Sequence, residues 1–333
     1  MNFVVQRGRL VLFGELPPNS IALDGYCPGP TIDPERHRFS FDHHGECLRH
    51  ATAATCQQVL DALLLGLDPK KCNVYLNDVD SDSVLAAWLL ANPTRVHEPL
   101  VRDLVANAGA RDAHGPAYVL RNPALVASYH EGALAPLDRA RRSGQYQNCD
   151  LGELLGLCLE RTSAFFAGEI ISGTLTEPRA SCSMMNRGNG WVMAAGGPGA
   201  FASLYEAGHL RVVLTRGQPD GTTAFTIAKQ SEFVTGFPVG PDSRKGSILA
   251  ALSANEVGWG GSTTVGGAPR HSDGSRSRLT PERVFVIVEQ VVARYIGSCE
   301  NNKSEDDYQG VVPQQGDAGG AKRHAASGER LQP

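Results

Sequence analysis

The sequence predicts an α/β protein, with a mainly parallel sheet in an N-terminal domain and a second, smaller α/β domain after it. Two observations carry this prediction. Short apolar runs alternate with helix-like stretches through about residue 135, the pattern of a parallel sheet with crossover helices. Further strand-like runs, a glycine-rich loop and a closing helix follow between residues 190 and 298. We therefore expect two layered domains joined by a helical segment.

The N-terminal domain, residues 1–135, is defined by five predicted elements. Each predicted strand is a short apolar or alternating run, and each predicted helix is a longer run rich in Ala and Leu. The predicted strands are SIAL (20–23), RFSF (38–41) and NVYL (73–76). The predicted helices are ATAATCQQVLDALLLG (51–66) and SVLAAWLLA (83–91).

The remainder of the chain divides into three predicted segments. Residues 136–189 read as a helical connector, with LGELLGLCLERTSAFFAGEII as its clearest helix. Residues 190–298 read as the second domain, with strands GWVMAA, LRVVLTR and TAFTIAKQ and a final helix TPERVFVIVEQVVARYI. Residues 299–333 hold too few apolar side chains to offset the entropy lost on ordering, so we expect a disordered tail.

The composition argues against several classes of partner. The net charge of −4 arises from mixed signs, without the basic clusters that neutralise nucleic-acid phosphates, so we expect no duplex nucleic acid. No apolar run reaches the roughly 18 residues of a spanning helix, and MNFVVQRGRLVLFGELPP lacks a signal-peptide pattern. We expect a cytoplasmic protein without a membrane partner. A homo-oligomer is compatible with this composition.

Acidic and imidazole side chains follow all three predicted N-terminal strands. In an open α/β sheet, ligands gather beyond the carboxyl ends of the strands, so neighbouring strands would bring these groups into one crevice. In the third group the spacing of two places all carboxylates on one side if the segment stays extended. The groups are Asp24 after the first strand, Asp42, His43 and His44 after the second, and Asp78, Asp80 and Asp82 after the third.

Five or six carboxylates packed together need a counter-charge, and a divalent metal is the simplest one. Many carboxylates with one or two imidazoles and no thiolate suit Mn²⁺ or Mg²⁺ better than structural zinc. Two such ions activate water and clamp a phosphate, which predicts phosphoester hydrolysis. Taken alone, DVDSD also fits a solvated helix cap and the His pair a structural pair. Their combination at matched strand ends favours the metal site.

At these residues the sequence resembles the DHH phosphoesterase superfamily. FDHHGE and the helix after it are similar to the family's signature strand and helix. NDVDSDSVLAAWLL is similar to its other metal-binding stretch, and SIALDG to the strand that supplies a bridging aspartate. The resemblance covers about residues 20–115. The order of the two stretches is reversed, as in a circular permutation, and Leu76 stands where the family commonly has a histidine ligand.

The resemblance implies a site for two metal ions, either Mn²⁺ or Mg²⁺. It implies that Asp24 bridges the ions, that Asp80 and Asp82 divide between them, and that His43 binds the second ion. Asp78 is the candidate to replace the missing histidine; the alternative is weak binding of the first ion. These five residues are the metal ligands predicted from the strand ends.

Further roles follow from the same resemblance. Asp112, in AGARDAHG, is the expected last metal ligand, with Asp103 as a rival. His44 is expected to orient a neighbour or to protonate the leaving oxygen, and Asp42 to hold a histidine by a hydrogen bond. His114 either lines the pocket or is a surface histidine. We thus predict His44 and Asp42 as the catalytic residues.

The second domain carries a predicted substrate-binding loop. VVLTRG and GWGGSTTVGGAPR are similar to the arginine strand and the glycine-rich loop of the family's C-terminal domain, across about residues 190–296. Glycines permit close backbone approach, hydroxyls donate hydrogen bonds and arginine grips phosphate. An ordinary mobile turn is the alternative. The candidates are Arg216, Gly261, Ser262, Thr263, Gly266, Gly267 and Arg270.

Together these features predict an enzyme, a metal-dependent phosphoesterase of the hydrolase class. Its expected substrate is a small phosphorylated molecule in the interdomain cleft, foremost a nucleotide or very short oligonucleotide. One alternative is a pyrophosphatase-like enzyme that acts on inorganic phosphate chains. The other is a non-catalytic nucleotide-binding regulatory protein on the same scaffold.

Overall fold

The computed structural model describes residues 1–45, 47–115, 118–170, 181–197, 199–240, 246–271 and 273–306, with side chains through residue 297. Residues Met1–Tyr295 form one compact unit, and Ile296–Pro333 form a second. Of the second unit, the structure describes the end of a helix that finishes at Asp306. The predicted division of the chain near residues 135 and 190 stays a prediction.

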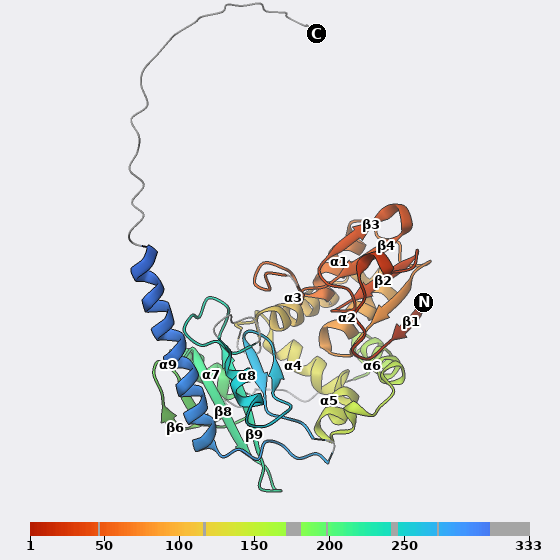
Figure 1. The fold of residues 1–333 in the computed structure, drawn as a ribbon. Helices are drawn as coiled ribbons and strands as arrows, with labels where there is room; N and C mark the ends of the chain where they lie inside the picture. Colours follow the sequence, from red (N-terminus) through yellow and green to blue (C-terminus); the bar gives the residue numbers. More distant parts are fainter. Residues whose placement is uncertain are drawn as a thin grey trace, which may run out of the picture. The chain divides into compact units, whose positions relative to one another are not determined.

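The elements follow one another in chain order (Figure 1). The strands are β1 (Asn2–Val5), β2 (Ser20–Leu23), β3 (Thr31–Asp33), β4 (Arg38–Phe41), β5 (Asn73–Leu76), β6 (Ser183–Arg187), β7 (Val192–Ala195), β8 (Arg211–Gly217), β9 (Thr223–Lys229), β10 (Gly260–Gly261) and β11 (Val265–Gly267). The α-helices are α1 (Thr55–Leu64), α2 (Ser81–Ala91), α3 (Pro99–His114), α4 (Pro123–Gly132), α5 (Ala135–Arg142), α6 (Leu151–Phe166), α7 (Ala200–Glu206), α8 (Ile248–Ser253) and α9 (Pro281–Asp306). Short 3-10 helices are η1 (Phe13–Glu15), η2 (Pro34–Arg36), η3 (Pro93–His97) and η4 (Gln145–Gln147).

The first sheet has the strand order β1-β5-β2-β4-β3. The pairs β1–β5, β5–β2 and β2–β4 are parallel, and β3 runs antiparallel to β4 at the edge. Figure 1 shows the strands β1 to β4 grouped with helices α1 and α2. The α/β class predicted from the sequence is confirmed, with a first sheet that is partly parallel.

The register of the three central strands brings their carboxyl ends level with one another. Leu23, the last residue of β2, is paired with Phe41 of β4 on one side and with Leu76 of β5 on the other. The residues that follow these three strands therefore lie together at the carboxyl end of the sheet. In open α/β sheets, ligands bind beyond this end of the strands.

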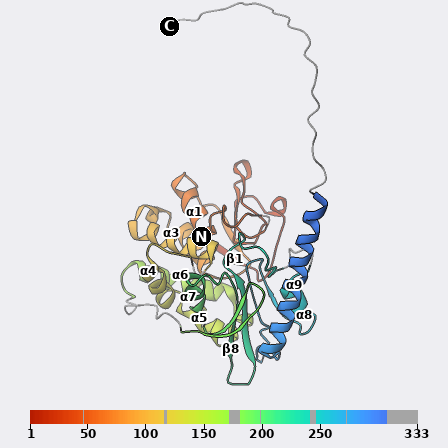
Figure 2. The ribbon, with the colours of Figure 1, turned by 90° about the vertical axis from the view of Figure 1, so that its left-hand side faces the viewer.

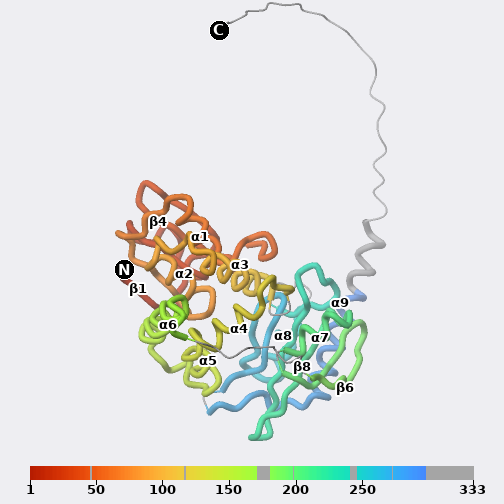
Figure 3. Tube along the Cα trace, turned by 180° about the vertical axis from the view of Figure 1, so that it is seen from behind, coloured from red at the N-terminus to blue at the C-terminus, as the bar shows by residue number. Residues whose placement is uncertain are grey.

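Helix α2 is the buried centre of the first layer of helices. Its residues from Asp82 to Leu90 are all buried, so it has no polar face. A helix that is apolar on all sides must be covered by other elements. It packs against α1, α3 and α6. Figure 2 shows α3 beside α1, and Figure 3 shows α6 close to α2 and β1.

The core of the first sheet extends into helices that the sequence predicted as a connector. Leu137 of α5 and Leu155 and Cys158 of α6 belong to the same buried cluster as Ile21 and Val74 of the sheet. Of these helices, α6 packs directly against α2, and α5 packs against α6. This packing fixes the position at which α2 begins, beside the ends of the strands.

The second sheet has the order β10-β11-β9-β8-β7-β6. Its β7–β8 pair is parallel and its other pairs are antiparallel, so the sheet is mixed. Val192, Leu214 and Ala228 pack with Phe201 and Leu204 of α7 in one apolar cluster. Met193 and Val213, on the opposite face of the same strands, are fully buried as well, so β7 and β8 are covered on both faces.

The strands and helices predicted from the sequence are all present, with β2, β4 and β5 at the residues expected. Strands β1 and β3 were not predicted. Helix α9 continues to Asp306, into the segment 299–333 for which the sequence favoured disorder; residues 307–333 lie outside the described residues. Among the described residues, no helix combines the length and the apolar character that crossing a membrane requires.

Trp88 provides a test of the packing of α2. It is 1% exposed, its ring centroid lies 4.5 Å from that of Phe166, and its Nε1 donates to Ser163 Oγ at 2.9 Å. We expect Trp88→Ala to lower the free energy of unfolding by about 3 to 5 kcal/mol in urea titrations. Trp88→Phe, the control, should lose only about 1 kcal/mol because it keeps most of the buried ring. A loss below 1 kcal/mol for Trp88→Ala would show that α2 is not held by this contact.

Candidate metal centre

Asp24 directly follows β2 and adopts a left-handed backbone conformation, with φ of 51°. This conformation turns the chain away from the sheet at once, and Asp is among the few side chains that tolerate it. Thr55 Oγ1 donates to Asp24 Oδ1 at 3.1 Å. The carboxylate is thereby fixed above the end of the strand, at the edge where the neighbouring strands also end.

Asp42 organises the turn that follows β4. Its Oδ2 accepts from the N–H groups of Gly29 at 2.8 Å and Gly45 at 3.2 Å, and its Oδ1 accepts from the His44 N–H at 3.0 Å. Oδ1 also lies 3.1 Å from His44 Nδ1. Asp42 therefore holds both the backbone of the DHH turn and the ring of His44, as the resemblance implied.

His44 lies between two carboxylates. Its Nδ1 is 3.2 Å from Asp24 Oδ1 and 3.1 Å from Asp42 Oδ1, and its side chain is 43% exposed. Burial would lower the pKa of His44, but Asp24 and Asp42 outweigh it and raise that pKa to about 10. The ring is thus anchored at one nitrogen, while its other edge faces the open side of the site.

His43 is completely buried, and its Nε2 faces three carboxylates. Nε2 lies 2.9 Å from Asp112 Oδ2, 3.5 Å from Asp82 Oδ2 and 3.6 Å from Asp24 Oδ1. The contacts of Nε2 are ion pairs without hydrogen-bond geometry, and neither buried ring nitrogen has a hydrogen-bond partner among the described residues. Burial would lower the pKa of His43, but Asp112 and Asp24 raise it to about 9. One nitrogen cannot satisfy three carboxylates, whereas a cation among them can.

Asp82 joins the beginnings of two helices. It lies in the first turn of α2, and its Oδ2 and Oδ1 accept from the backbone N–H groups of Thr55 at 2.7 Å and Cys56 at 2.8 Å. These N–H groups belong to the first turn of α1, where they have no partner within the helix. Asp82 therefore has a structural role in addition to facing His43.

Asp80 caps α2 and faces the other carboxylates. Its Oδ1 accepts from the Ser83 N–H at 2.8 Å. Burial raises the pKa of Asp80 well above its usual value, and the charges of Asp24 and Asp112 raise it further. Burial, Asp24 and Asp112 likewise raise the pKa of Asp82 to about 7. The repulsion shows that these carboxylates share one small volume.

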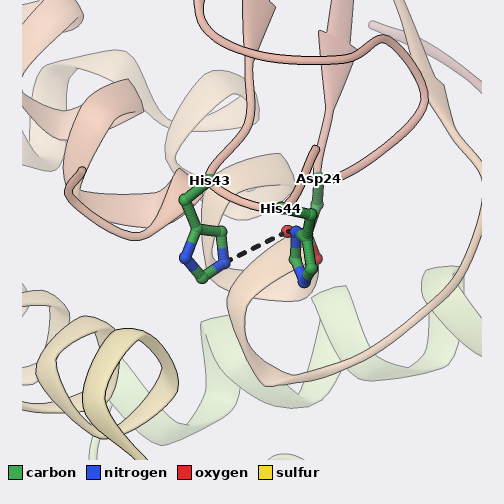
Figure 4. Close-up of side chains that lie close together, drawn as sticks. All are labelled: Asp24, His43 and His44. Atoms are coloured by element: carbon green, nitrogen blue, oxygen red, sulfur yellow. Dashed lines mark ion pairs between the residues drawn. The ribbon is translucent and has the colours of Figure 1, made fainter. Parts of the chain in front are cut away.

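Asp24 is the carboxylate that its neighbours favour as an anion. Burial opposes its ionisation, but His43 and His44 outweigh the burial and hold the pKa of Asp24 well below its usual value. Figure 4 shows Asp24 together with His43 and His44, and marks the ion pair between Asp24 and His43. The two imidazoles thus stabilise the charge of Asp24, whereas the charges of Asp80 and Asp82 are not stabilised to the same degree.

Two groups of side chains have ligand atoms close enough to hold a metal ion. Asp24, His43 and His44 form one group, and His43, Asp82 and Asp112 form the other. Because His43 belongs to both, the groups adjoin. Carboxylate oxygens with imidazole nitrogens are a donor set for Mn²⁺ or Mg²⁺. The buried His43 Nε2 and Asp112 Oδ2 form an ion pair but have no hydrogen-bond partner among the described residues, and both atoms fit such an ion.

Asp103 and His114, two further candidates, lie outside both groups. Asp103 accepts from Asn107 Nδ2 at 3.0 Å and from Asn122 Nδ2 at 2.9 Å, so its carboxylate ties α3 to the start of α4. His114 stacks on Tyr118, with ring centroids 4.5 Å apart. Burial lowers the pKa of His114. Of the two rival aspartates, Asp112 is the one that lies beside His43.

Asp78 also lies outside both groups, and its carboxylate accepts a hydrogen bond from Tyr146 instead. The Tyr146 hydroxyl makes a short hydrogen bond to Asp78 Oδ1. The sequence predicts Asp78, Asp80 and Asp82 on one side of an extended segment. That segment is extended only as far as Asp80, because α2 begins at Ser81, and Asp82 therefore projects from a helix. Asp80 and Asp82 consequently face the cluster, while Asp78 faces η4.

Tyr146 is a contact of the site that the sequence did not indicate. Its hydroxyl lies 2.7 Å from the Val79 carbonyl oxygen and 3.3 Å from the Val79 nitrogen. Arg7 and Arg141 flank its ring, with their guanidinium carbons 5.2 and 5.0 Å from the ring centroid. Arg141 Nη2 donates to the same Val79 carbonyl at 3.0 Å. Together these groups fix the backbone directly before Asp80.

The glycines of the predicted substrate loop form a hairpin of β10 and β11. A Cβ atom at Gly261 would lie 2.3 Å from the Val265 carbonyl oxygen, and one at Gly266 would lie 2.5 Å from a Leu249 methyl group. At Gly267 the nearest heavy atom would be 3.5 Å away, an ordinary contact. Close packing within the hairpin explains Gly261, and close packing against α8 explains Gly266.

The loop hydroxyls make hydrogen bonds within the protein. Ser262 Oγ accepts from the Val265 N–H at 3.3 Å. The Thr263 hydroxyl makes a short hydrogen bond to the Glu232 carboxylate. These contacts give Ser262 and Thr263 a structural role in the turn, and their predicted contact with substrate stays a prediction.

A third arginine, Arg276, lies near the predicted candidates Arg216 and Arg270. A hydrogen bond from the His271 N–H to the Ser275 carbonyl, 3.1 Å long, closes the turn between Arg270 and Arg276. Burial lowers the pKa of Arg276, and the positive charges of Arg270 and Arg216 lower it further. The sequence did not indicate Arg276, because its position depends on this turn.

Tyr146→Phe tests whether the Tyr146 hydroxyl positions the metal ligands. We expect the variant to lose about 1 to 3 kcal/mol of stability and to bind Mn²⁺ about 10-fold more weakly in calorimetric titrations. Tyr129→Phe is the control, because its buried hydroxyl hydrogen-bonds Thr162 Oγ1 at 3.1 Å, away from both ligand groups. It should lose similar stability and keep the Mn²⁺ affinity. Equal Mn²⁺ affinities in the two variants would rule out a positioning role for Tyr146.

Comparisons with known proteins were negative: no family model, no curated protein and no solved structure matches this chain. The resemblance to the DHH phosphoesterases thus stays an inference from the residues quoted above, and the candidate site is defined by its own geometry.

Proposed function

We propose that this protein is a divalent-metal-dependent phosphohydrolase related to the DHH phosphoesterases. Its substrate would be a small phosphorylated molecule, foremost a nucleotide or a very short oligonucleotide. The observation that carries this proposal is the buried His43 Nε2, which faces Asp24, Asp82 and Asp112 without a hydrogen-bond partner among the described residues. An arrangement with this much uncompensated charge suits a metal centre better than a structural ion pair.

The residues present fit two adjoining cation sites. His43, Asp82 and Asp112 would hold one ion, and Asp24 with Asp80 would hold the other, since the charge of Asp24 reaches Asp80. His44, the third member of the first group, would stay available to move a proton. Two Mn²⁺ or Mg²⁺ ions would polarise a phosphoryl group and generate a nucleophile from water near neutral pH. Asp42 orients His44, and Thr55 orients Asp24, so each side chain is held before substrate arrives.

His44 is the proposed proton donor to the leaving oxygen. Its Nδ1 is held by Asp24 and Asp42, and its ring is the exposed one of the two adjacent imidazoles. Nε2 is therefore the atom placed to hold a proton toward a bound substrate. If His44 instead serves as a metal ligand, the proton must come from another group.

The second sheet supports an anionic substrate. Arg216 and Arg270 lie near enough to Arg276 for their positive charges to lower its pKa. A guanidinium group suits phosphate because its N–H groups match two oxygens at once. Several such groups suit a substrate with more than one anionic group, as nucleotides and short oligonucleotides have.

The proposed metal dependence is tested by ligand substitution. His43→Ala and Asp80→Asn should lower kcat and Mn²⁺ affinity by more than about 100-fold, because even the hydrogen-bond partners of metal ligands are worth about 10- to 100-fold. A panel of nucleotides, dinucleotides, cyclic dinucleotides and pyrophosphate with Mn²⁺ supplies the substrate, and calorimetry supplies the affinity.

The exposed His97 provides the matched control, since His97→Ala removes an imidazole from η3 and should leave both quantities unchanged. Chelation should abolish activity in the wild type. Full activity in chelated protein, or in either ligand variant, would contradict the proposal. Mn²⁺ binding without turnover of any compound would instead favour a non-catalytic binding protein.

Arg270→Ala tests whether the second sheet contacts the substrate. If Arg270 contacts a phosphate away from the reacting group, KM should rise about 10- to 100-fold with a much smaller change in kcat. Arg283→Ala, which removes a contact with Asn255, is the control. An unchanged KM for Arg270→Ala would remove this arginine from the binding site.

A further inference from the structure

Arg49 lies beside the candidate metal centre, in the segment between β4 and α1. Its Nη2 is 3.4 Å from the Asp112 carbonyl oxygen and 3.7 Å from Asp112 Oδ2. Its side chain is 25% exposed. Arg49 belongs to neither of the two ligand groups, and no sequence motif marks it as a candidate site residue. Arg49 therefore places a positive charge at the margin of an acidic cluster.

The guanidinium of Arg49 is only partly engaged. Its Nε is buried and has no hydrogen-bond partner among the described residues. By contrast, Arg95 grips Glu98 through Nε at 2.6 Å and Nη2 at 2.7 Å, a two-point contact. Among the described residues, the carboxylate oxygen paired with Arg49 is a full ångström farther away than either of these. Arg49 thus retains N–H donors that its own ion pair does not use.

The surroundings of Arg49 are arranged for an anion. Its charge opposes protonation of His44 and of His114, so it lies near both rings. His50 and His43 act on His114 in the same way. Arg49 therefore carries a positive charge close to both rings and to the Asp112 carboxylate. When cations take up the Asp112 carboxylate, the attraction of Asp112 for Arg49 weakens, and an anionic ligand is the remaining partner.

We propose that Arg49 binds a non-bridging oxygen of the phosphate group that reacts at the metal centre. This inference rests on the proposed function. The guanidinium would neutralise charge on the phosphate and orient it toward His44. Because this contact is with the reacting group, it serves any phosphorylated substrate, unlike the contact proposed for Arg270.

The experiment measures binding of inorganic phosphate to the full-length, Mn²⁺-loaded protein by calorimetry, together with Mn²⁺ affinity. Arg49→Gln should weaken phosphate binding by about 10- to 100-fold, the loss of one charge-assisted contact. Mn²⁺ affinity should stay within about 3-fold of wild type, because Arg49 is not a ligand. Arg49→Lys, which keeps the charge without the planar fork, should fall between Arg49→Gln and wild type.

Arg142→Gln is the matched control, because Arg142 is 81% exposed on α5 and, in the part of the chain that the structure describes, forms its ion pair with Asp138, at 3.8 Å. It should leave both affinities unchanged. If Arg49→Gln keeps the phosphate affinity of wild type, or weakens Mn²⁺ and phosphate binding equally, Arg49 merely supports Asp112 and the inference fails.

The same measurements separate this inference from the proposed function. Wild-type protein that binds Mn²⁺ and phosphate but hydrolyses nothing would overturn the enzymatic proposal and, with a weakened Arg49→Gln, would keep Arg49 as an anion contact. An active wild type with unchanged phosphate binding in Arg49→Gln would overturn only the role of Arg49. Wild-type protein that takes up no Mn²⁺ would overturn both.

Discussion

The hydrogen bonds from the Thr55 and Cys56 N–H groups to Asp82 connect the two helices on which the site is built. Each helix begins with N–H groups that lack partners, and a carboxylate in the interior needs donors for both of its oxygens. Asp82 meets both needs at once. The contact holds the start of α1 against the start of α2, beside the ends of β2 and β4. The positions of Asp24, His43 and Asp80 all depend on that arrangement.

The positive ends of α1 and α2 also help to explain how several carboxylates coexist in the interior. A helix N-terminus favours nearby negative charge, and two of them meet here. Even so, the pKa values of Asp80 and Asp82 are raised while that of Asp24 is lowered. The raised pKa values mean that Asp80 and Asp82 take up protons more readily than free carboxyl groups do. Protons and divalent cations would compete for these oxygens.

Much of the first sheet and part of the site could be predicted because their determinants are local. The runs SIAL, RFSF and NVYL are strand-like by themselves, and parallel neighbours necessarily end on the same side. The choice among Asp78, Asp80 and Asp82 could not be made this way. It depends on where α2 begins and on Tyr146, which lies far along the chain and binds Asp78. Local spacing carries no information about such a partner.

The same distinction holds in the second sheet. The sequence indicated a glycine-rich loop and two arginines, but packing explains Gly261 and Gly266 without any ligand. Arg276 could not be selected, because only the turn closed by His271 and Ser275 brings it near Arg270. Arg49 could not be predicted as a site residue for a related reason. Its significance arises from the proximity of Asp112, which belongs to α3.

The positive φ of Asp24 restricts which residues this position can accept during evolution or design. A longer carboxylate such as Glu keeps the charge but enters this backbone region less readily, and β-branched residues are excluded more strongly. Glycine adopts the backbone easily and loses every oxygen. Asparagine alone shares both the shape and the conformational tolerance of aspartate. Asp24 is therefore constrained twice, by the turn and by its charge, and replacement with Asn separates the two constraints.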